Sequence, residues 1–271
     1  MKFPKEFKKY LILIKTAWLR QLVYRTTIYA YRFGNIFDIL FQMAIWMAVY
    51  KSTEVVYGYT YHQMLTYIMI SWLINFFISN FGVEDTIARN IQNGELSIYL
   101  VRPLSYLKAI TAFSIGRASM SIISGAIMQI GVIAVFHNHV LPPSSIWAIV
   151  EIIFIVLISY FVRLELSMLL GMLALWIIEI SGILHISNVI IRLLSGGYAP
   201  LSLLPAAVYQ ACLFFPFAYI IFLPTQLYLG KISLLQGFYG ILIELAWLAV
   251  LYVIIKIVWR KGLRQYEAVG I

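Results

Sequence analysis

The segment FYGILIELAWLAVLYVIIKIVW, residues 238–259, decides the class of fold. A helix that crosses the hydrocarbon core of a bilayer needs about 20 mostly apolar residues. This segment meets that requirement, since Glu244 and Lys256 are its only charged residues. Further stretches of this kind lie at about residues 31–50, 63–81, 119–136 and 146–162, and another helix is expected from about 166 to 194. The sequence therefore predicts an all-α integral membrane protein with about six transmembrane helices.

The composition excludes a soluble protein. Of the 271 residues, 62% are hydrophobic and 11% are charged, whereas a soluble domain carries about 25% charged residues. No polar stretch is long enough for a separate soluble module, so we expect a single membrane domain over residues 1–271. The only cysteine, Cys212, excludes an intramolecular disulfide and a zinc site built from cysteines.

The positive charges indicate the orientation of the chain in the membrane. The net charge is +9, and 16 of the 20 lysines and arginines lie in residues 1–30, 83–118, 163–165 and 256–271. Basic residues collect in the cytoplasmic loops of membrane proteins. The pattern predicts both termini in the cytoplasm, a cytoplasmic interfacial helix over residues 1–30 and a tight inner turn at residues 163–165. Because the charge flanks the apolar stretches, it does not indicate nucleic-acid binding.

Residues 84–105, EDTIARNIQNGELSIYLVRPLS, are too polar to lie in lipid and too many for a tight turn. Acidic residues at the start and Asn93-Gly94 further on suit a short helix, and Pro103 marks a second break. We interpret the segment as an amphipathic helix on the cytoplasmic side. It could dock on a partner through Ile87 and Ile91 as exposed apolar side chains, or it could only rest on lipid.

A second interruption, residues 195–231, is apolar but contains several helix breakers. Short re-entrant helices that enter the outer leaflet and return explain this pattern better than straight spans do. The breakers are Gly196, Gly197, Pro200, Pro205, Pro216 and Pro224. The sequence at 194–198, LSGGY, looks like the signature of ABC ATPases, but the chain has no GxxxxGK[ST] phosphate loop, so we expect no nucleotide site.

Ionisable residues within apolar stretches are functional candidates, because they are costly in lipid. Glu179 and Arg192 are the strongest, either as members of ion pairs, which we favour, or as a polar lining. Asp38 could pair with the amino-terminal basic cluster, and Glu151 and Glu165 could reach the interface. His137 and His139 give only a weak metal signal, and we find no arrangement of residues typical of catalysis.

The order of these features resembles the ABC-2 type permeases, the membrane subunits of bacterial ABC exporters, and most closely a drug-efflux-like branch. The resemblance rests on IQNGEL at 91–96, LVRPLS at 100–105, LSGG at 194–197, FPFAY at 215–219 and WRKGL at 259–263. Each motif is short, but together, in this order, they cover nearly the whole chain.

The resemblance implies a partner-dependent transporter in the bacterial inner membrane. Two permease chains, identical or different, would work with two ATPase subunits that hold the ATP and magnesium, and this chain would hold no cofactor. The outer breakers would form a gate, and residues 84–97 would be the coupling helix. The residues expected to take part in coupling are Glu84, Asp85, Ile87, Arg89, Ile91, Gly94, Glu95, Arg102 and Pro103. From the residues alone, a membrane enzyme or an ion-coupled transporter stays possible.

Overall fold

The computed structural model describes residues 5–23, 25–79 and 82–266. The helices of the first half are α1 (Lys5–Val23), α2 (Arg25–Val49), α3 (Tyr61–Ile78), α4 (Val83–Gln92), α5 (Leu96–Leu100) and α6 (Tyr106–Phe136). Those of the second half are α7 (Ile146–Met172), α8 (Ser181–Leu194), α9 (Ala206–Phe214), α10 (Phe217–Ile220), α11 (Phe222–Tyr228) and α12 (Leu234–Leu263). Three short 3-10 turns, η1 (His137–His139), η2 (Leu173–Leu175) and η3 (Leu201–Leu203), complete the helical part.

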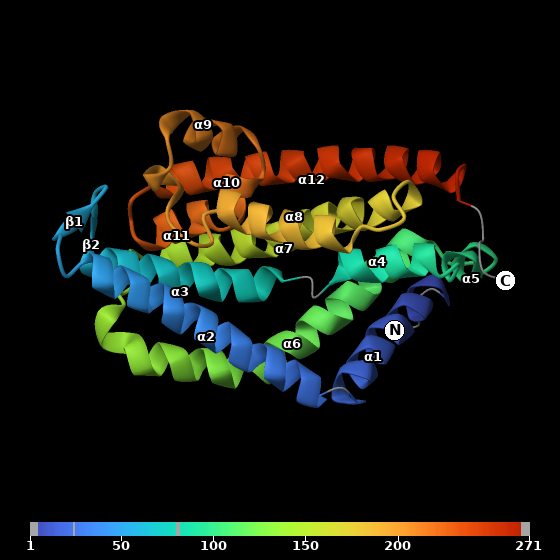
Figure 1. Cartoon of the computed structure of the whole chain (residues 1–271), viewed down its shortest axis with the longest axis horizontal. Helices are drawn as coiled ribbons and strands as arrows, with labels where there is room; N and C mark the ends of the chain where they lie inside the picture. Colours follow the sequence, from blue (N-terminus) through green and yellow to red (C-terminus); the bar gives the residue numbers. More distant parts are fainter. Residues whose placement is uncertain (1–4, 24, 80–81, 267–271) are drawn as a thin grey trace.

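The helices form an elongated bundle with two distinct ends (Figure 1). One end carries an antiparallel hairpin of β1 (Val55–Val56) and β2 (Tyr59–Thr60), and we call it the hairpin end. The other carries α5, the start of α1 and the end of α12, and we call it the α5 end. At the hairpin end, α3 and α12 each begin with a reciprocal capping box, Thr60 with Gln63 and Ser233 with Gln236. These boxes satisfy backbone N–H groups that would otherwise lack partners.

Among the described residues, the stretches that are long and apolar enough to cross a membrane are Tyr106–His139, Ile146–Leu175, Leu234–Leu263 and the combination of α3 and α4, Tyr61–Gln92. The apolar part of α2, Phe33–Val49, and the 14 residues of α8 are shorter. At 1.5 Å per residue, α8 reaches only about 21 Å, less than the roughly 30 Å hydrocarbon core. The predicted all-α membrane fold is confirmed, and the count of six spans stays a prediction.

The long helices pack through small residues and buried polar groups. Helices α7 and α12 lie side by side, and the Ser159 hydroxyl donates to the buried Glu244 carboxylate at 2.6 Å. Helix α1 lies along α6, where a Cβ on Gly116 would meet the carbonyl oxygen of Ile14 at 2.7 Å. The predicted interfacial helix over residues 1–30 thus corresponds to α1, except that residues 25–30 belong to α2.

The predicted turn at residues 163–165 is wrong. Helix α7 continues through Arg163 and Glu165 to Met172, and the chain reverses only between residues 173 and 180. The predicted helix over 166–194 is therefore two elements, the end of α7 and the separate α8. A charge at 163 does not end the helix, because the Arg163 guanidinium donates to the Asn188 side chain inside the bundle.

Glu179 lies in the turn between η2 and α8, outside both helices, and its predicted place within the membrane stays a prediction. Its carboxylate accepts from the backbone N–H of Ser181 at 3.1 Å and from the hydroxyl of the same serine. These hydrogen bonds stabilise the ionised form and lower the pKa of Glu179. The residue acts locally at the start of α8.

Candidate functional site

Helix α4 is held tightly against α7. Ile87 is fully buried and Ile91 nearly so, both within one apolar cluster that also contains residues of α7. A Cβ added to Gly171 of α7 would lie 2.8 Å from the carbonyl oxygen of Glu84 and 2.8 Å from the Cβ of Ile87. The expectation that Ile87 and Ile91 are exposed for docking is therefore wrong, because α7 already covers them.

The apolar surface that α4 lacks is found instead on α5 and the turn after it. Val101 is 84% exposed, and Ile98 and Leu100 are each 47% exposed. Arg102 and Pro103 follow and are also exposed. We call residues 98–103 the α5 tip. Its three apolar residues were not among the residues predicted from the sequence to dock, although three aliphatic side chains within a polar segment, just before a proline, were a usable signal.

One contact joins the α5 tip to α1, and a second fixes the start of α6 just after the tip. The Lys9 ammonium of α1 donates to the carbonyl oxygen of Pro103 at 3.3 Å. Tyr106, at the start of α6, stacks on Trp259 of α12 with ring centroids 5.2 Å apart and planes 8° from parallel. Gly94 lies between α4 and α5 with φ of 74°, a conformation that glycine adopts without strain. The tip therefore has a defined position relative to α1, α6 and α12.

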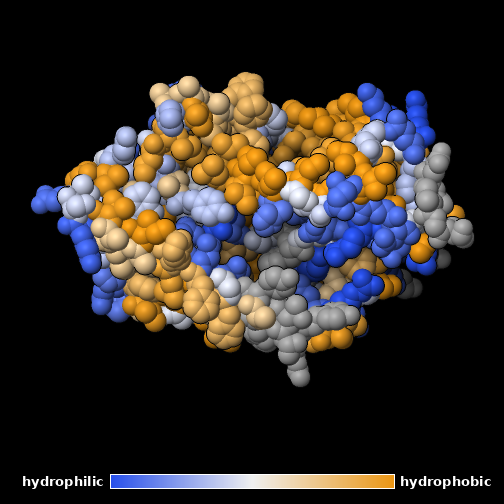
Figure 2. All heavy atoms as spheres, viewed as in Figure 1, coloured by the Kyte–Doolittle hydropathy of each residue, from blue (hydrophilic) through white to orange (hydrophobic). Residues whose placement is uncertain are grey.

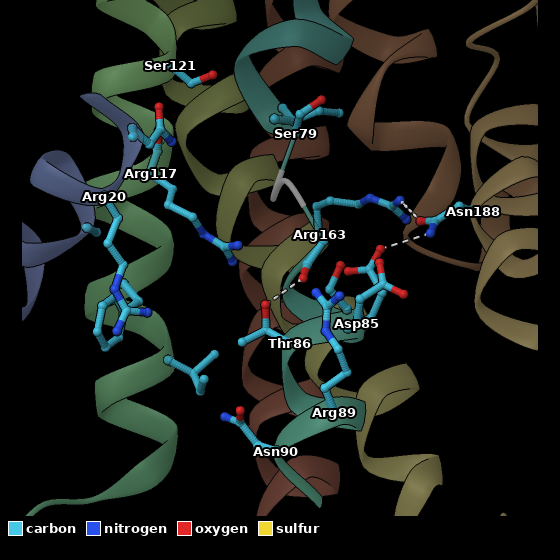
Figure 3. Close-up of a pocket in the computed structure, with 18 of the residues that line it drawn as sticks. Arg20, Ser79, Asp85, Thr86, Arg89, Asn90, Arg117, Ser121, Arg163 and Asn188 are labelled. Carbon is cyan, nitrogen blue, oxygen red and sulfur yellow. Dashed lines mark hydrogen bonds between the residues drawn. The ribbon is translucent and has the colours of Figure 1, made fainter. Parts of the chain in front are cut away.

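A chain of hydrogen bonds connects α7, α8 and α4. The Arg163 guanidinium donates to Oδ1 of Asn188, and Nδ2 of Asn188 donates to Oε1 of Glu84 at 2.8 Å (Figure 3). Glu84 is only 5% exposed. The structure therefore places Glu84 in an internal network, whereas Asp85, Arg89 and Glu95 of the predicted coupling set are exposed.

A cavity of about 1010 Å³ lies between α1, α3, α4, α6, α7 and α8. Figure 2 shows hydrophilic surface at the α5 end and in a hollow in the middle of the face, with hydrophobic surface on either side. Figure 3 shows Arg117 extending from α6 and Arg89 extending from α4 into the same space. Its charged lining consists of Arg20, Arg89, Arg117, Arg163, Arg192, Glu84, Asp85 and Glu95. Sequence reasoning named several of these residues but did not bring them together.

Arg192 forms an ion pair, as the favoured interpretation of the sequence predicted. Its guanidinium lies 2.6 Å from the Asp38 carboxylate, and it also lies over the Tyr198 ring at 4.3 Å from the centroid. Asp38 therefore pairs across the bundle with α8, and the expected pairing with the amino-terminal basic cluster is wrong for the described residues.

The segment between α8 and α12 is broken as predicted. Helix α9 and the α10–α11 pair meet at 80°. Gly196 has φ of 77°, and its carbonyl oxygen accepts from the Tyr67 hydroxyl at 2.7 Å in a buried position. Gly197 follows it in the turn, and the prolines stand at element starts (Pro200, Pro205 and Pro216) or in the first turn of α11 (Pro224). The gating role stays a prediction.

Among the described residues, no group of three or more histidine, cysteine, aspartate or glutamate side chains could hold a metal ion. The ring of His139 stacks instead on that of His62, with centroids 6.4 Å apart.

The family model described as "ABC-2 family transporter protein" matches residues 36–270. The chain belongs to the ABC-2 family of transporter proteins. A comparison with curated proteins gave no match. The resemblance seen in the sequence motifs is thus confirmed, and the ABC-2 protein is a multi-pass membrane protein and a permease of an ABC transporter. The match begins within α2 and includes both the α5 tip and the broken segment.

Proposed function

We propose that this ABC-2 permease is the membrane subunit of an ATP-driven exporter for a hydrophobic or amphipathic cargo. It works with two ATPase subunits, which hold the ATP and magnesium, and with a second permease chain. The α5 end faces the cytoplasm of a bacterial cell, the hairpin end faces outward, and the protein lies in the inner membrane. The single observation that carries this proposal is the exposed apolar α5 tip.

The α5 tip has the character of a docking surface for a soluble subunit. Val101 is more exposed than any of the apolar residues of α4, and it adjoins the exposed cation Arg102. Arginine is enriched among the residues that dominate protein–protein binding energy, and the exposed aliphatic side chains beside Arg102 add apolar surface that a partner can bury. The aliphatic side chains of the tip take the role that the sequence analysis had given to Ile87 and Ile91.

Helix α4 then has a different role, which is to transmit force. Its buried face contacts α7 at Gly171, and Glu84 connects it through Asn188 to α7 and α8. Displacement of the α5 tip when the ATPases close would therefore move α7 and α8. The exposed Asp85, Arg89 and Glu95 remain available to contact the ATPase or the cargo.

Cysteine cross-linking tests the position of the ATPase. With Cys212 replaced by alanine, the chain has no cysteine, and Val101→Cys adds one at the tip. Val55→Cys is the matched control, since Val55 is 56% exposed at the hairpin end. A bifunctional thiol cross-linker in native membranes should join Val101→Cys, but not Val55→Cys, to a protein with ABC ATPase peptides. Equal cross-linking of both variants, or of neither, contradicts the proposed docking.

A charged tip tests the function itself. Val101→Asp should weaken ATPase binding at least tenfold, or about 1.4 kcal/mol, because the contact would then bury an unpaired carboxylate. ATP hydrolysis and transport by the reconstituted complex should fall together, while the amount of permease in the membrane stays the same. Unchanged transport in Val101→Asp would refute the coupling role of the tip.

A further inference from the structure

The cavity between α1, α3, α4, α6, α7 and α8 contains a concentration of arginine. Five arginines line it against three acidic side chains, and Asp38 pairs with one of the five, Arg192. Arginine presents a planar set of N–H donors that matches the oxygens of a phosphate or carboxylate. The lining is therefore suited to an anionic group.

The acidic side chains of the cavity lie near the arginines but make no close ion pair with them. Among the described residues, Glu84, Asp85 and Glu95 form no ion pair with an arginine within 4.0 Å. Glu84 accepts instead from the neutral Asn188 amide at 2.8 Å. The carboxylates and guanidinium groups thus line the same cavity, and the space between them remains open to a ligand.

Two guanidinium groups have buried N–H donors that lack an acceptor. Arg163 donates through one terminal nitrogen to Asn188, and its other terminal nitrogen, NH1, is buried without a hydrogen-bond partner. The Nε of Arg192 is also buried without a hydrogen-bond partner. Buried donors are rarely left without acceptors. An oxygen-rich ligand in the cavity would supply them.

The remaining lining adds an apolar wall to the cationic one. Phe76 and Ile78 of α3 and Ile110 and Phe113 of α6 line the same cavity. Such a wall can pack against the apolar tail of an amphiphile, whereas a free inorganic anion would make no favourable contact with it. The ligand therefore has a charged head and an apolar body.

The depth of the arginines agrees with such a ligand. Arg163 is 17 residues along α7 from Ile146, or about 25 Å at the helical rise, and Arg117 is 19 residues from Phe136, or about 28 Å. Measured from the hairpin end, both lie near the far edge of a hydrocarbon core roughly 30 Å thick. Headgroup phosphates of the cytoplasmic leaflet lie at this level.

We propose that the cavity binds the phosphate or carboxylate head of the cargo, an anionic amphiphile taken from the cytoplasmic leaflet. This inference rests on the proposed function, because it gives the chemical class of what the exporter moves. Arg163 and Arg89 contact the head, Asn188 and Glu84 orient Arg163, and the α3 and α6 side chains cover the tail.

Two probes with the same tail test the recognition of charge in the purified full chain, in a neutral detergent and without an ATPase. Dodecyl phosphate should bind at least tenfold more tightly than dodecylphosphocholine, and at least tenfold more tightly than inorganic phosphate. Arg163→Gln should weaken dodecyl phosphate binding at least tenfold, about 1.4 kcal/mol. Lys256→Gln, at an exposed cation of α12 outside the cavity, should leave it unchanged.

Arg89→Gln is a second variant that should fold normally, because Arg89 is exposed and its replacement leaves the hydrogen bond between Arg163 and Asn188 intact. It should also weaken binding while the thermal unfolding temperature stays that of the parent chain. Equal binding of the two dodecyl probes, or unchanged binding in both arginine variants, overturns the anionic site. Binding of inorganic phosphate as tight as that of dodecyl phosphate overturns the amphiphile.

A third measurement separates cargo from a resident lipid. In the complex with its ATPase, dodecyl phosphate should stimulate ATP hydrolysis in the parent chain and not in Arg163→Gln. Binding without stimulation overturns the cargo assignment and identifies a bound lipid. The proposed exporter function would then still stand on the Val101→Cys cross-link, so the two failures are distinguishable.

Discussion

Replacing Gly171 by alanine should separate α4 from α7 and destabilise the α5 end of the bundle. The added Cβ would lie 2.8 Å from the Glu84 carbonyl oxygen, whereas ordinary contact begins at about 3.4 Å, so the helices must move apart by roughly 0.6 Å. The oxygen belongs to the backbone, so rotation of a side chain cannot relieve the contact. Overpacking of this kind costs about 1–3 kcal/mol.

Gly131→Ala is the matched control for this change. Gly131 lies within α6, and a Cβ there would meet nothing within 4 Å. Alanine is favoured over glycine in a helix by up to about 1 kcal/mol, so Gly131→Ala should be neutral or slightly stabilising. Because both variants gain the same helix preference, the difference between them isolates the clash, which should be about 1–3 kcal/mol.

The unfolding free energy can be measured by titrating the purified chain from a mild detergent into a denaturing one. The transport activity of the complex measures whether the shift of α4 also reduces coupling. We expect Gly171→Ala to lower both quantities and Gly131→Ala to lower neither. If the two variants behave alike, α4 does not lie in backbone contact with α7, and the proposed path of force is wrong.

Two further predictions concern contacts that hold the bundle together. Asp38→Asn and Arg192→Leu should each lower the unfolding free energy measured by the same titration. In the double variant, the total loss should be smaller than the sum of the two single losses by about 1 kcal/mol or more. Additive losses would show that the 2.6 Å ion pair contributes nothing to stability. Tyr67→Phe should cost about 1–2 kcal/mol, because it leaves the buried Gly196 carbonyl oxygen without its donor. Tyr239→Phe, at an exposed tyrosine of α12, is its control and should change stability by less than about 0.5 kcal/mol; equal effects would argue against the hydrogen bond.

The class of fold could be predicted from the sequence because long apolar stretches admit few interpretations. Residues 238–259 fall within α12, and the breakers between α8 and α12 do produce short helices that bend by 80°. Both results follow from local properties, since apolar length and backbone restrictions need no knowledge of distant residues.

The errors arose where a distant residue decides the outcome. Arg163 looked like the end of a span, but Asn188, 25 residues further along, provides its acceptor within the bundle. Ile87 looked available to a partner because its helix is amphipathic, but periodicity does not tell which surface covers an apolar face. That surface is α7 at Gly171. The cavity was missed for the same reason, since its arginines come from separate helices.

Gly116 of α6 and Gly171 of α7 determine how movement passes between the helices. At Gly116 the backbone of α1 touches α6, and at Gly171 the backbone of α4 touches α7. Contacts between side chains can absorb a small displacement by changing rotamer, but contacts between main chains have no such slack. A displacement of α1 would therefore move the backbone of α6 directly, and a displacement of α4 would move that of α7. Even a displacement of less than 1 Å would be transmitted to these long helices.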